Sequence, residues 1–142
     1  MKVDIYLETD KQSQGCTKRK YGYVIQAMRN GEPETRDGFG TITGTYHQSN
    51  LHALSDALER FHAKCQICIH TKDAFVAARI LRISDMEAAG YKDTKGKQIR
   101  NAEEWGDLYK KISKYEFEIT SATGKHEYSE WLQEEMKKYE DG

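Results

Sequence analysis

The sequence has few of the features that mark a secreted or membrane protein. Its three cysteines, Cys16, Cys65 and Cys68, form an odd set that suits a reducing compartment better than a disulfide framework. Residues 1–4 contain no apolar segment like a signal peptide, and no run approaches the roughly 18 apolar residues that a membrane span needs. We therefore expect a cytoplasmic protein that makes no membrane contact.

The chain also lacks an excess of positive charge. Its net charge is -1 although 32% of its residues are charged, so the molecule as a whole is not drawn to nucleic acid. Any such binding must come from a local basic patch. The sequence also carries no phosphate-binding glycine motif and no serine nucleophile motif.

Little in the sequence would divide the chain. Its only proline is Pro33, and it shows no internal repeat, low-complexity tract or linker. With 142 residues it is long enough to bury a sizeable core and too short for two ordinary domains. We expect a single domain over residues 1–142.

Alternation of apolar and polar residues is the first positive signal, and it is typical of strands. We expect strands at residues 2–9, about 21–28, about 35–45 and about 115–120, and a short, largely apolar strand at residues 66–70 that is buried on both faces. Asn30-Gly31 has the chemistry of a hairpin turn between the second and third strands.

Helical spacing of apolar residues predicts helices between and after these strands. Leu51, Leu54 and Leu58 fall on one face of the first helix, and Ser49 or Asn50 is placed to cap it. Further helices are expected at about residues 73–83, after a capping box at residues 101–104, and from about residue 127.

The order of these elements predicts an α/β fold with a five-stranded mixed sheet and helices on its faces. The first three strands form an antiparallel meander. Parallel strands joined through helices form right-handed crossovers, so we expect the first, fourth and fifth strands side by side at the centre.

Four segments in the right order resemble the ribonuclease H family. Residues 90–101, GYKDTKGKQIRN, leading into Trp105 are similar to the stretch that enters the fourth helix of bacterial type 1 ribonucleases H. Residues 3–6, 71–76 and 121–126 fit the same family in order and spacing. The resemblance covers nearly the whole chain and implies a ribonuclease H-like fold.

The resemblance also implies where the catalytic carboxylates of the family would stand. Active members hold four acids at the centre of the sheet, and these positions fall on Glu8, His52, Lys72 and Glu130. The family has a loop histidine before the last helix, for which His126 is the candidate; the other reading is a surface histidine.

These substitutions oppose the chemistry of the family. Two Mg²⁺ ions must activate a water and stabilise the leaving oxygen of a phosphodiester, and Mg²⁺ prefers oxygen ligands. His52 is a poor ligand, and a cation such as Lys72 about 4 Å away opposes each unit of ionic charge by roughly 4 kcal/mol. We therefore expect no metal, no cofactor and little or no nuclease activity.

Two interpretations of these residues stay open. In one, Glu8 and Glu130 converge, and Lys72 lies between them in place of the metal with His52 at the margin. In the other, the side chains have drifted to solvent and contribute nothing, as exposed ion pairs commonly do.

Neighbouring acids offer a route to activity. Asp10 lies two residues beyond Glu8, and a one-residue slip of the chain would bring Asp73 to the place of Lys72. The alternative hypothesis is a divergent ribonuclease H that uses Glu8, Asp73 and Glu130. It would bind Mg²⁺ or Mn²⁺ and hydrolyse the RNA strand of RNA/DNA hybrids.

Two basic groups are candidates for binding nucleic acid. Residues 18–20 form one, and the other is Lys92, Lys95, Lys97 and Arg100, which match the end of the basic protrusion with which related enzymes grip a hybrid. By this resemblance the second group would contact phosphates, and its affinity would fall with salt. The other reading is a solvated loop, because nearby acids dilute the charge.

Cys65 and Cys68 have the spacing of half a zinc site, with His70 close by. On a strand these two thiols point to opposite faces, so we expect buried cysteines and no metal site. The leading hypothesis is a non-catalytic ribonuclease H-like module that binds an RNA/DNA hybrid, double-stranded nucleic acid or a protein partner. A purely structural partner protein is the third hypothesis.

Overall fold

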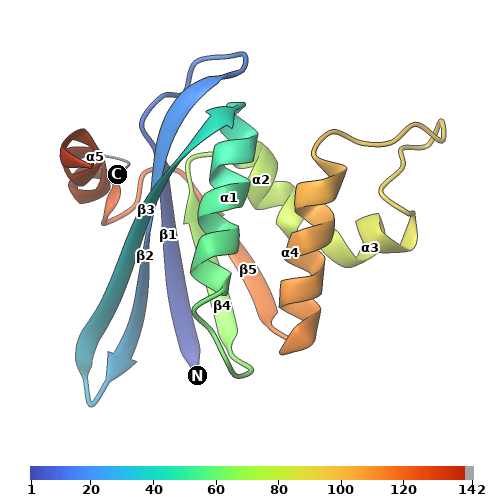
Figure 1. Cartoon of the computed structure of the whole chain (residues 1–142). Coiled ribbons are helices and arrows are strands. Elements are labelled where there is room, and N and C mark those ends of the chain that lie inside the picture. The colour runs from blue at the N-terminus through green and yellow to red at the C-terminus, as the bar shows by residue number, and fades with distance from the viewer. Residues whose placement is uncertain (140–142) are drawn as a thin grey trace.

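The computed structural model describes residues 1–139, and its centre is one five-stranded mixed sheet (Figure 1). The strands are β1 Lys2–Thr9, β2 Thr17–Arg29, β3 Glu32–Gly44, β4 Gln66–Thr71 and β5 Glu118–Thr123. Their order is β3-β2-β1-β4-β5, with β1, β4 and β5 parallel. The predicted fold class is confirmed. The first, fourth and fifth strands are neighbours as expected, although β5 lies at an edge rather than at the centre.

Helices cover the sheet unequally. They are α1 Tyr46–Leu58, α2 Ala74–Ile80, α3 Ile83–Ala88, α4 Ala102–Lys114 and α5 Ser129–Lys138. In Figure 1, α1 and α4 lie side by side over one face, whereas α5 lies apart from them and contacts β1 and β2. The helix expected at residues 73–83 is two short helices, and the break lets both Ile80 and Ile83 reach the core.

Alternation along β1 sorts its side chains between the two faces. Val3, Ile5 and Leu7 belong to the main core, which also contains residues of α1 and α4. Tyr6 packs in a second, smaller cluster with α5. Glu8 points the same way as Tyr6, so the sheet face under α5 carries the residues of interest.

Two helix starts differ from their predictions. α1 begins earlier than expected because Thr45 and Gln48 form a capping box, in which Gln48 N donates to Thr45 Oγ1 at 3.1 Å. Ser49 and Asn50 therefore lie buried inside the helix and do not cap it. Asn101 precedes α4 in a left-handed conformation with φ of 60° and makes no capping hydrogen bond from its side chain.

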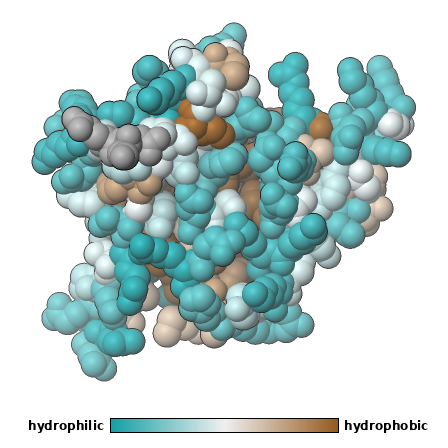
Figure 2. Space-filling model, viewed as in Figure 1, coloured by the Kyte–Doolittle hydropathy of each residue, from teal (hydrophilic) through white to brown (hydrophobic). Residues whose placement is uncertain are grey.

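The surface is largely polar. Figure 2 shows hydrophilic side chains over most of the face in view, which agrees with a charged fraction of 32%. In the part of the chain that the structure describes, no helix is long and apolar enough to span a bilayer.

Candidate functional site

A buried carboxylate marks the candidate site. Glu8 lies near the end of β1 on the face covered by α5, and it is 2% exposed. Burial of an ionised carboxyl is costly unless donors replace the lost water. The surroundings of Glu8 therefore decide what this site can do.

Four side chains lie against the two oxygens of Glu8. Oε1 lies 3.0 Å from Lys72 Nζ and accepts from Gln133 Nε2 at 2.7 Å. Oε2 accepts from Ser129 Oγ at 2.9 Å, and His126 Nε2 lies 3.3 Å from it. The partners of this carboxylate thus come from the residue that follows β4, from the loop before α5 and from α5 itself.

These donors change the acidity of Glu8. Burial by itself raises the pKa of the carboxyl, but hydrogen bonds led by those of His126 and Gln133 outweigh it. The net result is a pKa below the usual range. Glu8 is therefore ionised in the folded protein at neutral pH and balances the charge of Lys72.

His126 is part of the site rather than of the surface. Its side chain is 4% exposed, and its Nδ1 accepts from the backbone N–H of Tyr128 at 3.3 Å. A ring nitrogen that accepts carries no proton, so Nε2 holds it. Nε2–H donates to the carbonyl of Leu7 at 2.8 Å, with Glu8 close by.

Glu130 does not join Lys72 at Glu8, which corrects the predicted ion cluster. Its side chain is 83% exposed, and its Oε1 pairs with Lys125 Nζ at 2.7 Å. α5 directs Ser129 and Gln133 to Glu8 instead, since residues four apart share one face of a helix. The prediction was one residue out of register on this helix.

His52 also lies away from Glu8. Its ring centroid is 6.5 Å from that of Tyr21, on another part of α1. The residues of α1 that approach the end of β1 are Ser49 and Asn50. They meet Thr9 Oγ1 at 2.7 Å and 3.2 Å respectively. Among the described contacts, the residues of α1 that reach the end of β1 therefore stand two and three positions before His52, and His52 is not among the partners of Glu8.

Asp73 does not take the place of Lys72. Its Oδ1 accepts from the N–H of Val76 at 3.2 Å and caps α2. Its Oδ2 accepts from His47 Nδ1 at 2.7 Å and Asn50 Nδ2 at 3.2 Å, so this buried carboxylate faces α1. In the described chain, the one-residue shift that would bring the Asp73 carboxylate to the place of Lys72 does not occur.

Asp10, the other possible substitute, has a structural role at the end of β1. Its Oδ1 accepts from the backbone N–H of Lys20 at 2.9 Å. This bond holds the chain where β1 passes into the loop before β2. Asp10 therefore supports the strand ends and gives the Glu8 pocket no further ligand.

The basic residues of the loop between α3 and α4 are all exposed. They are Lys92, Lys95, Lys97 and Arg100. The Asp93 carboxylate orders this loop, because its Oδ1 accepts from the N–H groups of Lys95 and Lys97 at 2.9 Å each. The loop projects from the body of the molecule in Figure 1.

Sequence reasoning missed two basic residues beside this loop. Arg79 and Arg82 line a hollow of about 380 Å³ together with Lys92. The Arg79 guanidinium also lies over the ring of Phe75, 4.4 Å from its centroid, and that ring is 40% exposed. Their spacing of three residues on a helical segment was the available signal.

Two side chains of the basic run at residues 18–20 make internal contacts. Arg19 is fully buried and donates to the backbone carbonyls of Gly44, Lys11 and Ser13 at 2.9, 2.6 and 2.8 Å. Lys20 Nζ donates to a carbonyl of α5 at 3.0 Å. Arg19 thus ties the loop after β1 to the sheet, and Lys20 ties β2 to α5.

The donors around Glu8 do not fit two Mg²⁺ ions. Such ions need several oxygen ligands with negative charge, as Mg²⁺ is a hard cation. In the described chain, the side chains that pair with the Glu8 carboxylate are a lysine, a histidine, a serine and a glutamine. The negative charge of Glu8 is already balanced by the ammonium of Lys72.

Comparison with known proteins identifies the fold. No protein-family model and no curated protein matches the chain. Solved structures do match. LC9-RNase H1, a type 1 ribonuclease H with the type 2 active-site motif, aligns with TM-score 0.74 and 16% identity, over 94% of this chain and 69% of that chain.

Two foamy viral structures also match. The protease-reverse transcriptase in complex with double-stranded DNA gives TM-score 0.69 and 11% identity over 93% of this chain and 89% of that chain. The solution structure of the PFV RNase H domain gives TM-score 0.67 and 13% identity over 95% and 90%. The chain therefore has the ribonuclease H-like fold that its sequence resemblance predicted.

Proposed function

We propose that this ribonuclease H-like chain binds duplex nucleic acid, an RNA/DNA hybrid above all, without cleaving it. The observation that carries the proposal is the contact of Lys72 Nζ with Glu8 Oε1 at 3.0 Å. By the sequence resemblance, Lys72 falls at a position where active members of the family have a carboxylate for the divalent cation, which supports the proposal.

Displacing Lys72 by a metal is unfavourable on two counts. A divalent ion near the ammonium would be opposed by roughly 4 kcal/mol per unit charge at about 4 Å, with an effective dielectric near 20. It would also have to compete with donors that already satisfy both oxygens of Glu8. The geometry supports a stable ion pair in this pocket and a loss of hydrolysis.

The exposed loop supplies the binding surface in this proposal. Lys92, Lys95, Lys97 and Arg100 are held on an ordered turn, where they contact phosphates regardless of sequence. Arg79 and Arg82 extend the basic surface beside it. One foamy viral structure of this fold is a complex with RNA/DNA hybrid and another is a complex with double-stranded DNA, which supports this ligand class.

A cleavage assay tests the absence of hydrolysis. The unmodified protein is incubated with a labelled RNA/DNA hybrid in Mg²⁺ and in Mn²⁺, beside Lys72→Asp and the double variant Lys72→Asp with Ser129→Asp. We expect no cleavage by the unmodified protein and the greatest gain in the double variant, since Ser129 faces Glu8. Cleavage by the unmodified protein would establish the divergent nuclease instead.

A binding assay tests the proposed surface. Fluorescence anisotropy with the hybrid is measured over a salt series for the pair Lys95→Gln with Lys97→Gln. Affinity should fall, and the slope of log affinity against log salt should decrease by roughly 1 for each lost phosphate contact. The matched control is Lys137→Gln with Lys138→Gln, which removes the same charge from exposed positions of α5. Equal effects of both pairs, or no binding at all, would contradict the proposal and favour a protein partner.

A further inference from the structure

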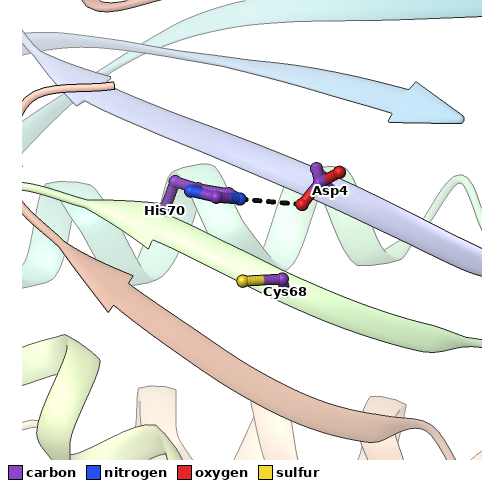
Figure 3. A group of neighbouring side chains, drawn as sticks. All are labelled: Asp4, Cys68 and His70. Atoms are coloured by element: carbon purple, nitrogen blue, oxygen red, sulfur yellow. Dashed lines mark hydrogen bonds and ion pairs between the residues drawn. The ribbon is translucent and has the colours of Figure 1, made fainter. Parts of the chain in front are cut away.

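A second group of chemically distinct side chains lies on the same face of the sheet as Glu8, nearer the start of β1. Asp4 comes from β1, and Cys68 and His70 come from β4 (Figure 3). One ligand atom from each lies within 4.8 Å of the other two. His70 Nε2 donates to Asp4 Oδ1 at 2.8 Å. All three side chains are half-buried.

The sheet itself brings these residues together. In the parallel register of β1 with β4, Asp4 is opposite Cys68 and Tyr6 is opposite His70. Residues two apart on a strand share a face, so the three side chains project to the same side. The Tyr6 ring stacks on the His70 ring at 4.3 Å between centroids and orients it.

From this arrangement we infer that Asp4, Cys68 and His70 form a binding site for a borderline divalent transition-metal ion such as Zn²⁺. Thiolate, imidazole and carboxylate are the ligand types that Zn²⁺ takes in proteins. With a deprotonated thiol and a neutral imidazole, the three ligands carry two negative charges and neutralise the ion.

The present spacing requires only a small adjustment. Tetrahedral Zn²⁺ with ordinary bond lengths separates its ligand atoms by about 3.3 to 3.6 Å. The donor atoms lie within 4.8 Å of one another, and the shared proton of the His70–Asp4 pair holds two of them at 2.8 Å. An ion that replaces this proton would part those two atoms slightly and draw Cys68 Sγ inward.

A hollow beside Asp4 and Cys68 leaves room for a fourth ligand. The hollow has a volume of about 520 Å³ and is lined by residues that include Asp4 and Cys68. α5 covers the part of this face around Tyr6 and leaves the hollow accessible. Three protein ligands with an open position is the pattern in which zinc keeps a water or binds a group of a ligand.

Cobalt titration distinguishes this site from the Glu8 pocket, because only a cysteine ligand produces sulfur-to-cobalt charge transfer. The full chain is titrated with Co²⁺ and the near-ultraviolet and visible absorption is recorded, and Zn²⁺ is then added to displace the cobalt. We expect one equivalent of cobalt, a thiolate charge-transfer band and tetrahedral visible bands. Zn²⁺ affinity is obtained from the displacement.

Variants assign the ligands. Cys68→Ser should abolish the charge-transfer band, and Asp4→Asn, at a side chain that is 40% exposed, should weaken Zn²⁺ affinity by about 10- to 100-fold or more. The matched control is Cys16→Ser, which changes an exposed thiol. The inference is wrong if no cobalt band appears, if Cys68→Ser retains it, or if Cys16→Ser removes it.

Discussion

At the scale of single residues, Glu8 shows how a buried charge is made tolerable. Lys72 supplies the opposite charge, and neutral donors from α5 occupy the remaining lone pairs. A buried ion pair retains its stability only when such additional hydrogen bonds are present. The same contacts that stabilise Glu8 leave it with little capacity to bind a metal.

Removing the charge of Glu8 should destabilise the fold. In Glu8→Gln, an amide faces donors and Lys72 loses its counter-ion, so the free energy of unfolding should fall by about 1–3 kcal/mol. Urea denaturation followed by circular dichroism measures the change.

The control for this prediction is Glu130→Gln, which removes the same charge from a position 83% exposed. An exposed ion pair is screened by solvent, so no measurable change in unfolding is expected. Equal stabilities of the two variants would show that the Glu8 contacts are energetically unimportant.

The stability that Glu8 provides should depend on pH. Its pKa is lowered in the folded state, chiefly because hydrogen bonds outweigh burial, so the unfolded chain binds this proton more readily. The contribution is complete above the unfolded pKa, near about 4.3, and is lost as the pH falls through the lower folded value. The difference in unfolding free energy between the native chain and Glu8→Gln should therefore shrink below that pH. A difference that stays constant on acidification would contradict this account.

The pairing of a positive with a negative side chain at this site could be predicted from the sequence. The neutral side chains that contact Glu8 could not. The presence of Lys72 beside Glu8 followed from the order of motifs in the resemblance. The roles of Ser129 and Gln133 did not, because a one-residue shift in the start of a helix rotates every side chain by about 100°.

At the scale of elements, the β2–β3 ribbon depends on glycines that face aromatic rings. Tyr21 pairs with Gly40 across the two strands, and Tyr23 pairs with Gly38. A Cβ at Gly40 would meet the hydroxyl of Tyr21, which is held by its hydrogen bond to Asp56 Oδ2 at 2.6 Å. The ring cannot move aside without losing that bond.

Gly40→Ala should therefore destabilise the protein by about 1–3 kcal/mol, the usual range for overpacking in a tight contact. The matched control is Gly106→Ala in α4, where a Cβ would meet only the Tyr91 ring at 3.9 Å. This second change should stabilise by about 0.5–1 kcal/mol, because alanine restricts the unfolded chain and favours the helix. Thermal denaturation of both variants measures these changes in stability. A Gly40→Ala variant as stable as the native chain would mean that the β2–β3 ribbon can shift to accommodate the added methyl group.

Local signals predicted the elements unevenly. The turn at Asn30 and Gly31 was confirmed, with φ of 53° and 80° at these residues, because both tolerate the left-handed region that such a turn requires. The cap of α1 was wrong because Thr45 and Ser49 both resemble capping residues. The hydrogen bond between Gln48 and Thr45 decides between them.

At the scale of the whole molecule, the two faces of the sheet are used differently. The face under α1 and α4 is apolar and holds the main core. The other face is only partly covered, by α5, and carries the polar and ionisable residues of both candidate sites. The net charge of -1 is a sum over the whole chain, so it does not indicate the local charge at either candidate site.

The strands and their connections could be predicted from the sequence alone, because periodicity and residue type act over a few neighbours along the chain. The prediction of Lys72 beside Glu8 came from the family resemblance. The positions of Ser129, Gln133 and His126 around Glu8, and of Asp4 beside Cys68 and His70, became known from the three-dimensional arrangement. Contacts between distant segments depend on strand register and on helix rotation, and neither is encoded in local spacing.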